Sequence, residues 1–120
     1  SEHTGWFAGL RDPFVGRALQ RLHADPARDW TVDDLGRAVG LSRSALVDRF
    51  NALVGQPPMA YLTSWRIQLA TQLLRDSHAS VAGIASQVGY ASEAAFSRAF
   101  RRVVGQPPAA WRRQAASVGG

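Results

Sequence analysis

Three arginines lie close together near the C-terminal end of the chain: Arg98, Arg101 and Arg102. On a helix with about 100° per residue they fall opposite Phe96 and Phe100, which gives one basic and one apolar face. A guanidinium group can donate two hydrogen bonds to guanine O6 and N7, or bind a phosphate. The neighbouring residues are small enough to let the helix enter a groove: Ala94, Ala95 and Ser97. Because almost no acidic residue lies nearby, we predict DNA contact rather than an ordinary solvated face.

Residues for other kinds of chemistry are scarce. The sequence has no cysteine, which excludes disulfides, thiolate metal ligands and cysteine nucleophiles. The three histidines are far apart and lack the spacing of metal ligands: His3, His23 and His78. There is no glycine-rich phosphate-binding loop either. We therefore expect no enzyme activity, no catalytic residue, no metal and no cofactor.

The overall charge favours a polyanionic partner. All fourteen basic residues are arginines, and against nine acidic residues they give a net charge of +5. Residues 81–120 hold five of these arginines and a single acidic residue, Glu93. Charge alone does not distinguish nucleic acid from a membrane surface. No apolar run approaches the roughly 18 residues of a membrane span, so we expect no membrane association, and the lack of cysteine fits an intracellular compartment.

The elements that carry the arginines are repeated along the chain. The string VGQPP occurs at 54–58 and again at 104–108. Before it, the apolar positions of two helices match at an offset of 50: Leu46, Phe50 and Leu53 with Phe96, Phe100 and Val103. Glycine ends a helix and proline begins the next, so VGQPP is a corner between helices. Each copy is a short helix, a turn with glycine and a second helix, the helix-turn-helix pattern.

Helical periodicity dominates the whole chain, which predicts an all-α fold with about seven helices. Two helix-turn-helix subdomains are joined by a long apolar helix from Met59 to about Asp76. At 1.5 Å per residue that helix is about 27 Å long, enough to serve two consecutive major grooves. The expected divisions are a linker remnant at 1–11, a first subdomain at 12–58, a linker helix at 59–77, a second subdomain at 78–116 and a disordered tail at 117–120.

The two copies differ on their outward faces. Asp48 stands in the first copy where Arg98 stands in the second. A carboxylate is repelled by phosphates, but it can accept a hydrogen bond from the cytosine amino group or pair with a nearby arginine. Both interpretations stay open here. We expect a weaker or differently reading first copy, with Arg43 and Arg49 as candidate phosphate contacts.

With these elements in place, the chain resembles the DNA-binding domain of the AraC/XylS family of bacterial transcription regulators. The resemblance covers residues 12 to about 114, and its clearest part is SVAGIASQVGYASEAAFSRAFRRVVGQPP followed by a tryptophan. It implies sequence-specific binding of double-stranded DNA. By position, it implies that the two recognition helices contact bases through Ser44, Val47, Asp48, Glu93, Ala94, Ala95 and Arg98. We expect Arg101 and Arg102 to contact phosphates.

The family also implies what surrounds the domain. Its members usually carry a separate effector-sensing or dimerising domain, most often N-terminal, and we expect RNA polymerase as a further partner. We expect a cytoplasmic, nucleoid-associated protein. The family often has serine before the corner proline, where this chain has Pro57 and Pro107, and this removes a hydroxyl that could cap a helix or contact phosphate.

A second hypothesis uses the same residues differently. The arginine face would then dock an acidic partner protein, and the chain would be a helical protein-interaction domain. In that case Arg98→Ala would weaken the partner complex and leave DNA binding unchanged.

Overall fold

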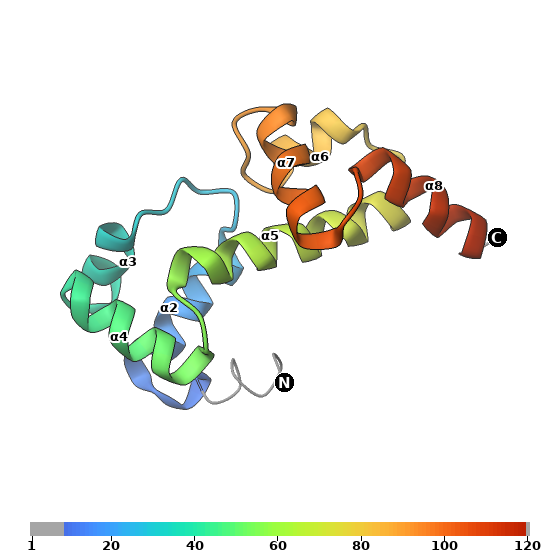
Figure 1. Ribbon diagram of the computed structural model, residues 1–120. Helices are drawn as coiled ribbons and strands as arrows, with labels where there is room; N and C mark the ends of the chain where they lie inside the picture. The colour runs from blue at the N-terminus through green and yellow to red at the C-terminus, as the bar shows by residue number, and fades with distance from the viewer. Residues whose placement is uncertain (1–8, 120) are drawn as a thin grey trace. The chain divides into compact units, whose positions relative to one another are not determined.

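The computed structural model describes residues 9–119, which contain helices and no strand (Figure 1). The predicted all-α class is confirmed. The described helices are α2 (Pro13–Ala24), α3 (Val32–Val39), α4 (Arg43–Val54), α5 (Pro58–Asp76), α6 (Val81–Gln87), α7 (Glu93–Val104) and α8 (Pro108–Gly119). The chain divides between Leu62 and Thr63 into two compact units. The long helix α5 is therefore shared, its start belonging to the first unit and the rest to the second.

Side-chain caps fix where the helices of the first unit begin. Asp12 accepts hydrogen bonds from the N–H groups of Phe14 and Val15 at the start of α2. Thr31 does the same for α3 and Ser42 for α4. Each such bond satisfies an amide that has no partner within the helix, as the sequence predicts for serine, threonine and aspartate at these positions.

One apolar core holds α2, α3, α4 and the start of α5 together. Its central side chains are wholly or almost wholly buried: Val15, Leu19, Leu22, Leu35, Leu46 and Phe50. Tyr61 of α5 packs edge-on against Phe50, with ring centroids 5.8 Å apart, and its hydroxyl hydrogen-bonds to the ring of His23 on α2. The orientation of α4 is therefore set by the face that carries Leu46 and Phe50.

The second unit is built in the same way from the remainder of α5 with α6, α7 and α8. Its core contains Ile67, Ala70, Leu74, Ile84, Phe96 and Phe100. Trp111 of α8 packs edge-on against Phe100, with centroids 6.3 Å apart. Tyr61 and Trp111 are 50 residues apart in sequence, so the repeat continues beyond VGQPP to an aromatic residue that packs on the preceding helix.

Both VGQPP strings form helix-to-helix corners. Gly55 and Gly105 have φ of 94° and 97°, in the left-handed region that glycine enters without strain. Their N–H groups donate to the carbonyls of Asn51 and Arg101, which closes α4 and α7. The second proline of each string is the first residue of the next helix. The predicted structural role of the string is confirmed.

Three expectations need correction. Residues 9–11 are helical and Gly9 is buried in the first unit, so the expected linker remnant does not extend to residue 11; residues 1–8 lie outside the described part. Helix α8 runs to Gly119 through Ala115 and Ala116, good helix formers, so the expected tail is helical at 117–119. Val103 is 48% exposed, because Val104 instead packs against the core at the last turn of α7.

Candidate nucleic-acid interface

Helix α7 presents most of the predicted contact residues to solvent. Ser92 caps it by accepting a hydrogen bond from the N–H of Ala95, 3.0 Å away. Phe96, Ala99 and Phe100 are buried, which fixes the rotation of the helix. The opposite side therefore faces outward, with Ala95 half-buried and the other predicted residues exposed: Glu93, Ala94, Arg98, Arg101 and Arg102.

The guanidinium groups of α7 have no ion-pair or hydrogen-bond partner in the described part of the chain. Within residues 9–119, no ion pair or hydrogen bond engages the side chain of Arg98, Arg101 or Arg102. Their donors are thus available to a ligand without first breaking an internal contact. An arginine face of this kind suits base edges or phosphate oxygens.

Helix α4 presents the matching face, but its arginines are paired. Ser44 and Asp48 are exposed and Val47 is half-buried. Arg43 lies 3.6 Å from the carboxylate of Asp33, an exposed pair of the kind that contributes little to stability. The structure thus brings the predicted residues of α4 to one surface, with their charge partly neutralised.

Arg49 is held more firmly. Its Nε donates to Oδ2 of Asp12 at 2.7 Å, and its guanidinium lies 5.2 Å from the centre of the Phe14 ring. Burial alone would raise the pKa of Asp12, but the N–H groups of Val15 and Phe14 and the guanidinium of Arg49 outweigh it, and the pKa is lowered. Asp12 is both the cap of α2 and the anchor of Arg49. This contact joins residues 37 positions apart and could not be foreseen from local sequence.

The turn that sets α4 against α3 demands a small residue. The N–H of Leu41 donates to the carbonyl of Gly36 at 2.9 Å, and a Cβ at Gly36 would lie 2.7 Å from the carbonyl oxygen of Leu41. In the second unit the N–H of Tyr90 donates to the carbonyl of Ala85 in the same manner. The second turn is one residue longer than the first, and it has Ala85 at the position of Gly36.

Tyr90 and Arg66 form a contact near α7 that sequence inspection missed. The Tyr90 ring packs on Phe96, and the guanidinium of Arg66 lies 5.7 Å from its centre. Burial raises the pKa of Tyr90, although the charges of Arg66 and Arg102 act in the opposite direction. The available signal was a single charged residue within the otherwise uncharged stretch 59–74 of the long helix.

Charge is distributed very unevenly between the two units. Residues 1–62 contain seven arginines and seven acidic residues, whereas residues 63–120 contain seven arginines and two acidic residues. The whole net charge of +5 therefore belongs to the second unit. Among the described residues no group of three or more histidine, cysteine, aspartate or glutamate side chains could hold a metal ion, and none of the described helices is long and apolar enough to cross a membrane.

Comparison with known proteins agrees with this geometry. A family described as a helix-turn-helix domain matches residues 35–114. An AraC-like transcription regulator of Streptomyces lividans is 56% identical over 110 residues, covering 92% of this chain and 36% of the relative. The regulator AlkR of Acinetobacter baylyi is 41% identical, covering 91% of this chain and again 36% of the relative. The chain thus spans about a third of the length of these relatives.

Solved structures give the same result. The C-terminal domain of AraT, a response regulator from Geobacillus stearothermophilus, superposes with a TM-score of 0.84 at 28% identity, covering 86% of each chain. The DNA-binding domain of AdpA, a global transcriptional factor solved in complex with a target DNA, superposes with a TM-score of 0.82 at 30% identity, covering 86% of this chain and 92% of that one. The chain therefore belongs to the AraC-type helix-turn-helix domains, the DNA-binding domains of bacterial transcription regulators, and it is not an enzyme.

Proposed function

We propose that the two units of this DNA-binding domain contribute unequally, with α7 supplying most of the affinity and specificity and α4 supplying less. The observation that carries this proposal is the state of the arginines. Those of α7 have no partner among the described residues, whereas Arg43 and Arg49 of α4 each face an aspartate. The free energy of breaking an ion pair opposes DNA contact only in the first unit.

The proposed base contacts follow from side-chain chemistry. Arg98 donates to O6 and N7 of a guanine, while Ala94 and Ala95 allow close approach and Glu93 accepts from a cytosine amino group. On α4, Val47 contacts a thymine methyl group, Asp48 accepts from cytosine, and Ser44 bonds either kind of edge. The exposure of most of these side chains supports the assignment.

The proposed phosphate contacts differ in strength. Arg101 and Arg102 reach the backbone flanking α7, and Arg43 reaches it from the start of α4 after leaving Asp33. A phosphate contact by Arg49 would compete with its hydrogen bond to Asp12 and its position over Phe14. We therefore assign Arg49 mainly to holding α4 against α2.

The two recognition helices occupy consecutive major grooves in this proposal. Helix α5 has 19 residues. At 1.5 Å per residue it is about 28 Å long, close to the roughly 34 Å helical repeat of B-DNA. The length of α5 therefore supports a site of two half-sites separated by about 10 bp between centres.

Beyond the domain, we propose that the full-length protein carries an effector-sensing or dimerising domain, N-terminal to this one. The relatives are almost three times longer than the segment they share with this chain, which supports this proposal. We further propose that the regulator acts in the cytoplasm at the nucleoid and contacts RNA polymerase at its promoters.

Selection of bound sequences from a random duplex pool tests sequence specificity. Affinity for the selected duplex and for a shuffled duplex of equal length is then measured by fluorescence anisotropy over a range of salt concentrations. We expect at least about a thousandfold preference for the selected duplex. Equal affinity for both duplexes, or no binding at low salt, contradicts the proposed mode of binding.

A further inference from the structure

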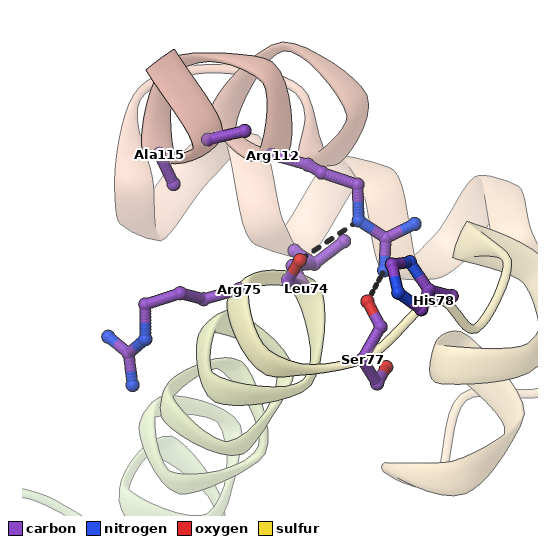
Figure 2. Close-up of a pocket in the computed structure, with 7 residues that line it drawn as sticks. Leu74, Arg75, Ser77, His78, Arg112 and Ala115 are labelled. Carbon is purple, nitrogen blue, oxygen red and sulfur yellow. Dashed lines mark hydrogen bonds between the residues drawn. The ribbon is translucent and has the colours of Figure 1, made fainter. Parts of the chain in front are cut away.

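A hollow lies in the second unit between the C-terminal end of α5 and helix α8 (Figure 2). Its volume is about 650 Å³. One wall is formed by Leu74, Arg75, Ser77 and His78, and the other by Arg112, Ala115 and Ala116. None of these residues belongs to the proposed DNA-contacting set.

The hollow is held open by hydrogen bonds across it. Nε of Arg112 donates to the carbonyl of Leu74 at 3.0 Å, and a terminal nitrogen donates to the carbonyl of Ser77 at 3.3 Å (Figure 2). The Leu74 carbonyl lies in the last turn of α5, where the helix supplies no further N–H groups, and Ser77 directly follows the helix. Arg112 thereby fixes the spacing of α5 and α8 beside the hollow.

The repeat shows which side chains of α8 are small at the hollow. At the offset of 50 residues, Ala115 aligns with Trp65 and Ala116 with Arg66. Two large side chains of the α5 segment are thus replaced by methyl groups at the corresponding positions of α8. The small side chains of α8 at these positions therefore leave a hollow that opens to the surface.

The lining combines an apolar floor with a basic edge. Leu74 is 2% exposed, and the half-buried Ala115 and the exposed Ala116 of α8 complete the apolar lining. The guanidinium group of Arg112 lies beside the imidazole of His78 on one side, and the side chain of Arg75 extends from α5 on the other side (Figure 2). Arg75 pairs with the adjacent Asp76, and the unit as a whole carries the excess positive charge.

We propose that this hollow is a docking site for a segment of another protein in which a large aromatic side chain is flanked by acidic residues. The aromatic ring packs in the apolar part of the hollow. The carboxylates of the flanking acidic residues accept hydrogen bonds from Arg75, His78 and the remaining donors of Arg112. A DNA phosphate matches the basic edge but leaves the apolar floor unfilled, so the chemistry favours protein over nucleic acid.

Docking here is compatible with DNA binding. Helix α7 faces the core through Phe96 and Phe100, and Trp111 of α8 packs on Phe100 from that side. Arg98 lies about 200° around the helix from Phe96 and therefore faces away from α8. A partner in the hollow and a duplex on α7 can be held at the same time.

The experiment uses the 120-residue chain and fluorescein-labelled peptides with the core Asp-Asp-Trp-Asp-Asp. Matched peptides carry alanine for tryptophan or lysine for aspartate. We expect saturable binding of the acidic tryptophan peptide alone. Ala115→Trp, which fills the hollow, should weaken it by roughly tenfold or more, while Ala109→Trp at an exposed position of α8 should leave it unchanged.

Further arms keep the proposal open to refutation if Ala115→Trp unfolds the domain. Arg75→Glu at the exposed edge should weaken the acidic peptide and favour the lysine peptide. An excess of DNA duplex should not displace the bound peptide. The proposal is overturned if the acidic peptide does not bind, or if Ala115→Trp or Arg75→Glu binds it as tightly as wild type. Displacement of the peptide by DNA would also overturn it, as would self-association of the chain that Ala115→Trp abolishes. DNA binding by Ala115→Trp, measured separately, distinguishes this failure from failure of the proposed function.

Discussion

Arginines of the same chemical type have different roles here because their surroundings differ. The guanidinium of Arg98 has no partner among residues 9–119 and lies on a helix whose rotation is fixed by buried phenylalanines, whereas Arg49 is held by Asp12 and Phe14. The sequence offers both as candidate DNA contacts, Arg98 from the outward face of its helix and Arg49 as an arginine next to Asp48. Only the tertiary contact across 37 residues separates the two roles.

The first prediction concerns Arg98. Replacing it with alanine should cost about 1 to 3 kcal/mol of binding free energy on the selected duplex and relax specificity at one base pair, because a bidentate contact is lost. Anisotropy on duplexes that vary each base pair in turn measures this. Arg113→Ala, an exposed arginine of α8, serves as the control and should preserve the order of preference. A loss that is equal on all duplexes would show that Arg98 contacts phosphate only.

The second prediction concerns Asp12. Its pKa is lowered in the folded state, so it stabilises the fold above its unfolded pKa, near 3.8, and this contribution is lost as pH falls through the lower folded pKa. Urea unfolding between pH 7 and pH 3 should therefore show a decline below about pH 4 that is smaller in Asp12→Asn. At neutral pH, Asp12→Ala should cost about 1 to 2 kcal/mol through loss of the cap. An identical pH dependence in wild type and Asp12→Asn would refute this role.

At the scale of elements, the helix limits are largely readable from the sequence. Serine, threonine or aspartate before an apolar run and glycine after it predict the starts of α2, α3, α4, α6 and α7 and the corners after α4 and α7. Which residues are buried or exposed depends on packing, and these local signals do not predict it. The exposure of Val103, the burial of Gly9 and the hollow beside Ala115 depend on which helices meet, and local periodicity carries no such information.

The third prediction tests the helix-turn-helix turn of the first unit. Gly36→Ala places a methyl group 2.7 Å from the carbonyl oxygen of Leu41, so backbone must shift. We expect a loss of about 1 to 3 kcal/mol in unfolding free energy. Arg37→Ala, at the exposed neighbouring position, should change stability by less, within about 1 kcal/mol. Chemical denaturation of both variants provides the measurement, and equal stability of Gly36→Ala and wild type would contradict the tight turn.

At the scale of the whole molecule, the distribution of charge distinguishes the two units. All of the net positive charge lies in residues 63–120, while the first 62 residues are neutral. Sequence alone shows this asymmetry. It does not show that the arginines of α4 face aspartates while those of α7 have no partner in the described part. This difference in pairing is the reason for proposing that the two units bind DNA unequally.

The fourth prediction follows from counterion release. Each phosphate contact contributes about 0.9 to the slope of log affinity against log salt concentration. Arg101→Ala should therefore reduce the slope by about one, whereas Arg49→Ala should leave it nearly unchanged and chiefly lower stability. Binding curves at several salt concentrations decide between the two. A reduced slope for Arg49→Ala would show that it leaves Asp12 to bind phosphate.

The most direct test of unequal binding is a base-pair scan of the selected duplex. We predict two half-sites with centres about 10 bp apart. The half-site of α7 is the one at which Arg98→Ala loses base discrimination. Base-pair substitutions there should cost more binding free energy than substitutions in the other half-site. Equal costs in the two half-sites, or larger costs in the half-site whose discrimination survives Arg98→Ala, would contradict the unequal roles of α7 and α4.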